Sequence, residues 1–191
     1  MNKCISGILT LILATLPVAA LAHTGQGDHG FLDGLAHPFL GMDHLLAMLV
    51  VGVWSVLNTR KVWLAPACFI VMLSCGTLLG QHGLIFPLLE PLVAISVLVL
   101  GILLMQAFKP GISTALVLIG GFAVSHGMAH GGELSAGTSV LVGIILGSLL
   151  LHVTGMSIAH LFLKGRPQLT CRFGQVIAGL GGGLIVSSVL G

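Results

Sequence analysis

The chain has 191 residues, of which 56% are hydrophobic and only 6% are charged, and its formal net charge is +2. An ordinary soluble domain carries about 25% charged residues, so this composition excludes a soluble fold and predicts an all-α, polytopic bundle of membrane helices. The basic residues form no stripe, which excludes nucleic acid as a partner. The 28 glycines follow no collagen-like period. In apolar runs, glycine typically lets two helices approach closely.

Residues 1–22 have the features of a cleavable secretory signal peptide. Lys3 supplies a positive start, an apolar run extends from Ile5 to Val18, and the small residues Ala20–Ala22 precede a cleavage point. Cleavage there would make His23 the first residue of the mature chain. An uncleaved first membrane helix is the alternative interpretation.

A short polar tail, which we expect to cover residues 23–36, follows the signal peptide. Its two histidines, His23 and His29, and the new α-amino group could collect a divalent metal ion at the mouth of the protein. A plain connector is the alternative interpretation, because a polar tail that contains glycine is flexible.

Six apolar segments follow, each long enough or nearly long enough to cross a bilayer at about 20 residues per crossing. They lie roughly at residues 37–57, 62–80, 88–108, 112–130, 136–163 and 173–190. The sequence therefore predicts one domain of six transmembrane helices over residues 23–191.

The basic residues of the mature chain predict how these helices are oriented. If the mature chain starts outside, all of them fall on one side of the membrane: Arg60, Lys61, Lys109, Lys164, Arg166 and Arg172. The positive-inside rule makes this side cytoplasmic. The opposite side carries acidic residues, namely Asp28, Asp33, Glu90 and Glu133. We therefore expect a multi-pass protein of the bacterial inner membrane with both mature termini in the periplasm.

The first apolar segment opens with polar residues that are costly in lipid. Pro38 suits the first position of a helix, which would put His37 at the helix mouth. His44 follows almost two turns later, on the same face and about 10 Å deeper, and Met48 continues this stripe. No lysine or arginine lies at the depth of Asp43 to neutralise it. We therefore predict that a metal ion does so; a protonated Asp43 bonded to a structural histidine is the alternative.

The fourth apolar segment ends in "SHGMAHGGE". His126 and His130 are four residues apart, a spacing at which two imidazoles on one helix can bind one metal ion. Glu133 lies on the same stripe if the helix continues through the two preceding glycines. Interhelical hydrogen bonding is the alternative role for the two histidines. Both this pair and the histidines of the first segment are expected in the outer third of the membrane.

Three further histidines extend the possible metal path. His152 and His160 lie in the fifth segment and could relay a metal ion inward, although packing roles are an equally good interpretation. His82, in an outer loop, either gathers metal or is simply solvated.

The donor types limit the ion. Imidazoles and carboxylates suit borderline divalent ions such as nickel, cobalt, zinc or copper(II), whereas magnesium and calcium prefer oxygen sites. No G-x-x-x-x-G-K-[ST] phosphate loop occurs, so the chain itself does not bind ATP by that route. A haem-binding membrane cytochrome with paired axial histidines, or a zinc or copper permease, remains as an alternative. We do not expect an enzyme, because no serine has a convincing activating base.

The two histidine motifs resemble those of the HupE/UreJ family of bacterial nickel and cobalt permeases. The first motif consists of His37, Pro38, Gly41, Asp43, His44 and Met48, and the second of His126, Gly127, Ala129, His130, Gly131 and Glu133. The resemblance extends over the signal sequence and the six segments, and implies that His37, Asp43, His44, His126 and His130 matter for transport.

What the resemblance implies is uptake of nickel or cobalt into the cytoplasm, serving the assembly of a metalloenzyme such as hydrogenase or urease. The partners would be the transported Ni²⁺ or Co²⁺ ion and the lipid bilayer. We expect no permanent cofactor and find no sign of an ATPase subunit. The sequence leaves open whether the chain forms a homo-oligomer.

Overall fold

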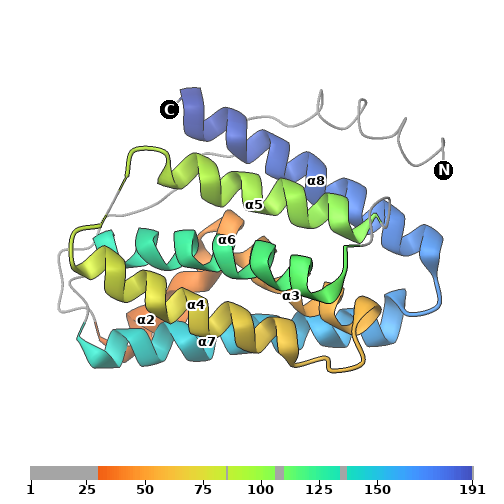
Figure 1. Cartoon of the computed structure of the whole chain (residues 1–191), viewed down its shortest axis with the longest axis horizontal. Helices are drawn as coiled ribbons and strands as arrows, with labels where there is room; N and C mark the ends of the chain where they lie inside the picture. The colour runs from red at the N-terminus through yellow and green to blue at the C-terminus, as the bar shows by residue number, and fades with distance from the viewer. Residues whose placement is uncertain (1–29, 85, 106–109, 134–136, 191) are drawn as a thin grey trace.

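In the computed structural model, the described residues are 30–84, 86–105, 110–133 and 137–190, and all regular structure in them is helical. The helices are α2 (Phe31–Leu40), α3 (Met42–Asn58), α4 (Leu64–Gln81), α5 (Leu89–Leu104), α6 (Ile112–Glu133), α7 (Thr138–Ile158), the π-helical η1 (Ala159–Leu163) and α8 (Pro167–Leu190). Figure 1 shows them packed into one elongated bundle. The predicted signal peptide and most of the predicted tail, with His23 and His29, lie outside the described residues.

Most of these helices are long and apolar enough to cross a membrane. By length and composition, α4, α6, α8 and the continuous α7–η1 segment qualify singly, and α2 and α3 qualify as one bent pair. The remaining apolar helix, α5, has 16 residues and is shorter than a full crossing. The chain is thus a multi-pass membrane protein, while the sixth crossing stays a prediction.

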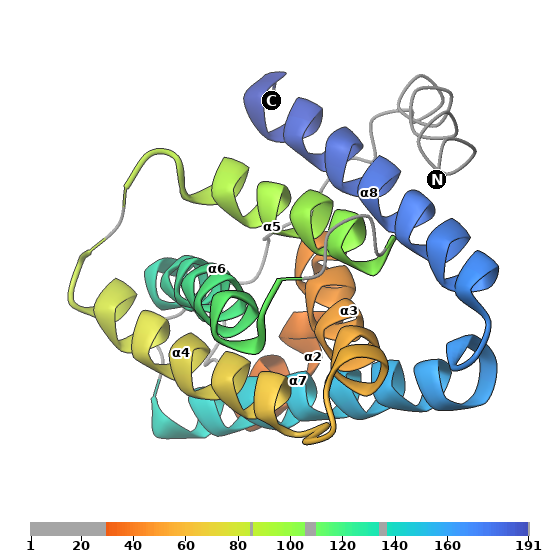
Figure 2. The ribbon, with the colours of Figure 1, turned by 45° about the vertical axis from the view of Figure 1, so that its right-hand side comes forward.

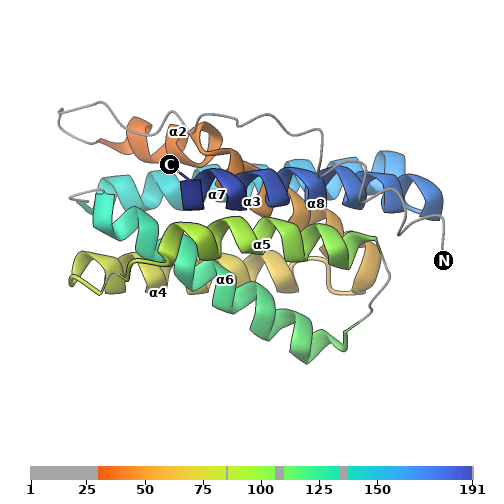
Figure 3. The same ribbon diagram turned by 90° about the horizontal axis from the view of Figure 1, so that it is seen from above.

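The sequence predicted that the first span is one straight helix, and this prediction is wrong. It breaks at Gly41 into α2 and α3, whose axes differ in direction by 83°. Figure 3 shows α2 along one edge of the bundle, before the chain turns into α3 in the interior. Gly41 has extended backbone angles (φ −87°, ψ 121°), and it both ends α2 and caps the start of α3.

The expected role of Pro38 as a first helical residue is therefore wrong. The helix begins seven residues earlier, at Phe31, where the Asp33 carboxylate accepts the Gly30 N–H at 3.0 Å. Pro38 lies inside α2, only two residues from its end, where the loss of one backbone N–H removes little of the helix. It follows that part of the expected tail, residues 31–36, is helical.

Glycines let the helices approach closely at three interfaces, which join α4 to α6, α7 to α2–α3, and α5 to α8. Between α4 and α6, a Cβ atom on Gly76 would overlap the Val124 carbonyl, and one on Gly127 would overlap the Leu73 carbonyl. The same kind of backbone contact joins α7 to α2–α3 through Gly34, Gly52, Gly143, Gly147 and Gly155, and joins α5 to α8 through Gly101, Gly174 and Gly181. The expected use of glycine for close helix approach is confirmed.

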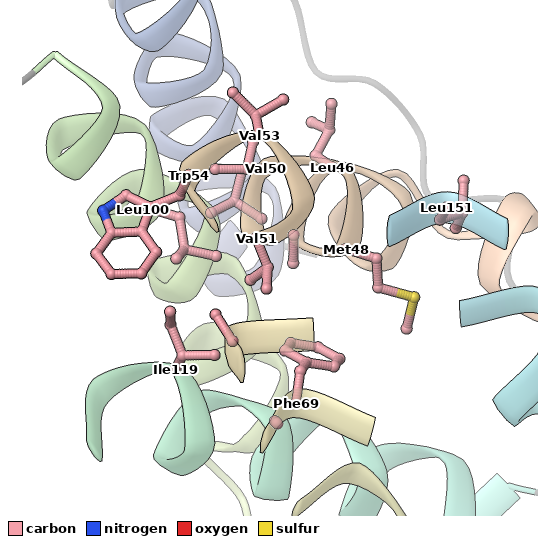
Figure 4. Close-up of a cluster of buried hydrophobic side chains, with 14 of the residues drawn as sticks. Leu46, Met48, Val50, Val51, Val53, Trp54, Phe69, Leu100, Ile119 and Leu151 are labelled. Carbon is pink, nitrogen blue, oxygen red and sulfur yellow. The ribbon is translucent and has the colours of Figure 1, made fainter. Parts of the chain in front are cut away.

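Helix α3 packs against α7 on one side and against α5 on the other, and its residues form much of the apolar core. In Figure 2, α3 lies between the α5·α8 pair above and α7 below. Met48, Val50, Val51 and Val53 have no exposed surface. Figure 4 shows them in one cluster of buried side chains that also includes Phe69 of α4 and Leu100 of α5. The first turn of α3, with Asp43 and His44, is only partly buried.

Two of the described connections carry basic residues. Arg60 and Lys61 precede α4, and Lys164 and Arg166 lie between η1 and α8. Figure 1 shows these two connections at the same end, opposite the α4–α5 connection. This arrangement agrees with the charge pattern of the sequence. Lys109 lies outside the described residues.

Candidate metal centre

The two motifs together contain five residues that are expected to matter for transport. Four of these are histidines, and their rings form one cluster. His37 comes from the last turn of α2, His44 from the first turn of α3, and His126 and His130 from α6. The ring centroid of His44 lies 4.7 Å from that of His126, 4.5 Å from that of His130 and 6.2 Å from that of His37. His37 and His130 are 4.6 Å apart. The predicted convergence of the two motifs is therefore found.

The way His37 and His44 meet differs from the expectation. The sequence placed them on one face of a single helix, about two turns apart. In the structure, the break at Gly41 sets α2 nearly at right angles to α3, and the rings of His37 and His44 lie on either side of the bend with their centroids 6.2 Å apart. His37 and His44 are partly exposed, whereas His126 and His130 have no exposed surface. The cluster therefore extends from the partly exposed His37 and His44 to the fully buried His126 and His130.

Most of the ring pairs are packed edge to face, and the pair of His44 and His130 is tilted by 47°. The ring planes of His37 and His130 meet at 75°, and those of His44 and His126 at 84°. Among the described residues, no three histidine, cysteine, aspartate or glutamate side chains stand in an arrangement that could hold a metal ion. Rotation of an imidazole about its Cβ–Cγ bond is soft, so binding would require the rings to turn rather than the helices to move.

Asp43 orients His44. One oxygen, Oδ1, lies 2.7 Å from Nδ1 of the His44 ring and also accepts the His44 backbone N–H at 2.7 Å. An ionised carboxylate can only accept hydrogen bonds, so Nδ1 carries the proton and Nε2 is the basic nitrogen. A carboxylate behind a histidine in this way is the usual support of a metal-binding imidazole. Asp43, whose side chain is 30% exposed, is thus hydrogen-bonded to an imidazole, and in the described residues no lysine or arginine forms an ion pair with it.

Ser96, on α5, orients His126 in the opposite sense. Its hydroxyl donates to the Val93 carbonyl at 2.6 Å and lies 2.8 Å from Nε2 of His126. The hydroxyl has one proton, which is used for Val93, so Nε2 of His126 must be the donor in the second bond. The other nitrogen, Nδ1, is then the basic one. It is buried and has no hydrogen-bond partner among the described residues.

The glycines next to the α6 histidines set the rotation of this helix. Gly127 and Gly131 directly follow His126 and His130, and each lies against the backbone of α4, at Leu73 and Thr77 respectively. Because consecutive helical residues point about 100° apart, contact of the glycines with α4 turns the two histidines toward α2 and α3.

The remaining predicted site residues are placed more peripherally or deeper. Glu133 is the last residue of α6, and its side chain is outside the described part of the structure. His82 is exposed directly after α4, and His160 is exposed on η1. Met48 and His152 are fully buried. Of the predicted path residues in the described part, only these last two lie in the interior.

Sequence reasoning missed two residues of the site. Ser96 bonds His126, and Phe69 of α4 packs against the rings of both His126 and His152, at centroid distances of 5.8 Å and 5.2 Å. Ser96 carried a weak signal, since it is a hydroxyl in the middle of an otherwise apolar helix. Phe69 carried none, because it is one apolar residue among many.

These features define a multi-pass, all-helical membrane protein with a cluster of four histidines, two of them fully buried, supported by an aspartate. The chain belongs to the HupE/UreJ family, whose pattern it matches over residues 11–184. This is a transporter-type family, generally associated with nickel or cobalt transport.

The chain is also similar to Protein HupE from Rhizobium leguminosarum bv. viciae. The two are 37% identical over 180 residues, which cover 92% of this chain and 91% of that protein. No solved structure matches the chain.

Proposed function

We propose that this protein carries a divalent transition-metal ion, Ni²⁺ or Co²⁺, across the bacterial inner membrane into the cytoplasm. The observation that carries this proposal is the meeting of four imidazoles from α2, α3 and α6, one of which is held by a carboxylate, in a chain built of membrane helices. Membership of the HupE/UreJ family supports it.

The donor set favours a borderline metal ion over a hard one. His44 and His126 each have one ring nitrogen bonded to an oxygen, which leaves the other nitrogen as a basic lone pair. Magnesium and calcium select oxygen ligands, so a site built from imidazole nitrogens discriminates against both. Raw affinity favours copper(II) over nickel, so selection between them depends on geometry and on the metal available.

The ion would enter at the break between α2 and α3. His37 and His44 are partly exposed there, and His126 and His130 lie behind them without exposed surface. A hydrated ion that exchanged water for these imidazoles one by one would not meet lipid without ligands. The tail residues His23 and His29, together with His82, would act before this step by raising the local metal concentration.

The membrane potential suffices as a driving force. An inside-negative potential favours entry of a divalent cation by roughly 4–5 kcal/mol per 100 mV, twice the value for a single charge. Uptake would therefore be facilitated or secondary, with the termini in the periplasm and the basic loops in the cytoplasm. Delivery to a nickel enzyme such as hydrogenase or urease is the expected use of the ion.

The test is uptake of radiolabelled nickel into cells or proteoliposomes that contain the full chain. We expect His44→Ala and Asp43→Ala each to reduce uptake at least tenfold, because the first loses a ligand and the second loses the group that orients it. Competition by unlabelled nickel, cobalt and zinc in the same assay identifies the preferred ion.

His82→Ala serves as the control for loss of a histidine outside the cluster. At saturating nickel it should transport within about twofold of the unchanged protein, since it can alter only capture. Full uptake by both His44→Ala and Asp43→Ala at normal protein levels would exclude the cluster as the metal site.

A further inference from the structure

One fully buried histidine lies outside the cluster of His37, His44, His126 and His130. His152, in α7, has no exposed surface. Its Nδ1 lies 2.6 Å from the Ser148 carbonyl oxygen, which can only accept, so Nδ1 carries the proton. Nε2 is then a basic lone pair, and it has no hydrogen-bond partner among the described residues. Burial of an unsatisfied polar atom costs about 1–3 kcal/mol, so such an atom in a native structure needs a reason.

Counted along its helix, His152 lies further from the connection between α6 and α7 than either histidine of α6. The end of α6 and the start of α7 are joined by residues 134–137, so depth can be counted from the same end of both helices. At 1.5 Å per residue, His130 is about 5 Å from that end, His126 about 10 Å and His152 about 21 Å. Counted in this way, the three histidines lie at increasing distances from that end.

A single aromatic ring separates His152 from the cluster. Phe69 contacts His126 on one side and His152 on the other. Each of these two histidines has one N–H bonded to an oxygen and one basic nitrogen without a partner in the described part of the chain. The arrangement resembles two ligands placed in sequence along one path.

A divalent ion that leaves His126 inward needs a further ligand. Moving a bare ion through an apolar interior costs tens of kcal/mol, so each step must offer a donor or water. The Met48 thioether is a further donor in the interior: Met48 is fully buried, and Figure 4 shows its side chain pointing from α3 toward α7. One imidazole and one thioether bind weakly enough for the ion to leave again.

We infer that His152 Nε2 is an inner metal station, which accepts Ni²⁺ or Co²⁺ from the outer cluster and passes it toward the cytoplasm. The inference rests on the proposed function and extends it by one defined ligand atom. Since the Ser148 carbonyl fixes the proton on Nδ1, Nε2 is presented as a ligand at all times.

Two substitutions separate a ligand role from a structural role. In His152→Asn, the side-chain amide N–H takes roughly the place of Nδ1 and can still donate to Ser148, but nothing replaces Nε2. In His152→Gln, the amide oxygen reaches roughly the place of Nε2 and can still bind a metal ion. A metal station predicts that asparagine is the worse replacement, whereas a structural hydrogen bond predicts that glutamine is.

The experiment measures Ni²⁺ uptake into proteoliposomes and equilibrium Ni²⁺ binding in detergent, both with the full chain. We expect His152→Asn to lower uptake at least tenfold, with unchanged melting temperature and unchanged binding at the outer cluster, and His152→Gln to retain several times more uptake than asparagine. Thr154→Val is the matched control on the same helix. The Thr154 hydroxyl is exposed and donates to the Leu150 carbonyl, so its loss should leave uptake unchanged.

Uptake by His152→Asn above half of the wild-type rate would overturn the inner station. So would a variant in which binding and uptake fall together, because that result indicates a packing role. Transport by the unchanged protein is measured first and tests the proposed function separately. If that protein binds and transports no divalent metal, the proposed function fails, and the inner station fails with it.

Discussion

The broken helix α2–α3 and the continuous helix α6 each bring two histidines to the same cluster, but by different means. In α6, His126 and His130 are four residues apart on one face, and contact of the neighbouring glycines with α4 fixes their direction. In α2–α3, His37 and His44 stand on either side of an 83° bend, and one residue, Gly41, makes the turn.

This difference shows which part of the structure each half of the site depends on. The α6 histidines depend on the packing of α6 against α4, so a substitution in this interface should lower the stability of the fold before it alters the histidine cluster. The α2–α3 histidines depend on the local space around Gly41, so errors there disturb the site while the fold remains. Substitutions on the two sides should therefore separate stability from transport.

The largest effect is expected for Gly127→Ala in α6. The new Cβ would overlap the Leu73 carbonyl oxygen, which belongs to the backbone and cannot swing away. We expect a loss of about 3 kcal/mol or more, at the upper end of overpacking effects, and little folded protein. Thermal melting in detergent measures it. Gly121→Ala, in the same helix, has nothing within 4 Å and should melt no lower than the unchanged protein. Equal melting of both variants would contradict the packing argument.

Gly41→Ala should affect transport more than stability. Alanine suits the backbone angles of Gly41, but its Cβ would lie 2.9 Å from Oδ1 of Asp43 and 3.1 Å from Nδ1 of His44. Both side chains would have to move by a few tenths of an ångström, which disturbs the hydrogen bond that orients His44. We expect nickel uptake to fall about tenfold with almost unchanged melting.

The matched control for Gly41→Ala is Gly137→Ala. Gly137 caps α7 in an extended conformation, and a Cβ there would have only Ser139 Oγ nearby, at 3.8 Å. Nickel uptake should therefore be unchanged in this variant. If both alanines reduce uptake alike, crowding of Asp43 and His44 is not the cause.

Ser96→Ala should lower both the stability of the protein and nickel uptake, each by a smaller amount. It removes the acceptor for the His126 Nε2–H and leaves this donor buried without a partner, at a cost of about 1–3 kcal/mol. The ring is then free to exchange its proton between the two nitrogens, so we expect uptake to fall three- to tenfold. Ser74→Ala removes a hydroxyl that donates to the Ile70 carbonyl of its own helix, and should change neither quantity. A Ser96→Ala variant with wild-type uptake would show that the His126 tautomer is unimportant.

Met48→Leu is expected to have the smallest effect. Leucine nearly conserves the volume of methionine, so stability should change by less than about 1.5 kcal/mol. Met48 follows His44 by one turn on α3, as His130 follows His126 on α6. Loss of the thioether should slow nickel uptake by about two- to threefold, as measured by initial rates. Unchanged rates would assign Met48 to packing alone.

The sequence predicted the class of the protein and the meeting of the two histidine motifs, while their role as metal ligands stays a prediction. The low charge content and the apolar runs located the helices closely: the predicted span 112–130 became α6, and 62–80 became α4. The spacing of His126 and His130 is a property of any helix, so it could be predicted without knowledge of the neighbours. The absence of lysine and arginine near Asp43 led to the prediction of a metal ion there, which stays a prediction.

The break at Gly41 and the role of Ser96 could not be predicted for physical reasons. Pro38 favours a helix start, but the Asp33 cap and the packing of α2 against α7 start the helix earlier, so a tertiary contact outweighs a local preference. Ser96 and His126 are 30 residues apart in sequence, and no periodicity in either helix indicates that they touch. Both cases involve contacts between helices that hydrophobic patterning does not encode.

The glycine contacts between α4 and α6 also have a mechanical consequence. Gly76 and Gly127 bring the two backbones so close that neither helix can slide or roll against the other without collision. The pair must therefore move as one rigid body, which carries His126 and His130 together. Alternating access of a metal ion to the two sides of the membrane would then come from the seam between this body and α3, where aromatic and imidazole rings, rather than backbones, meet.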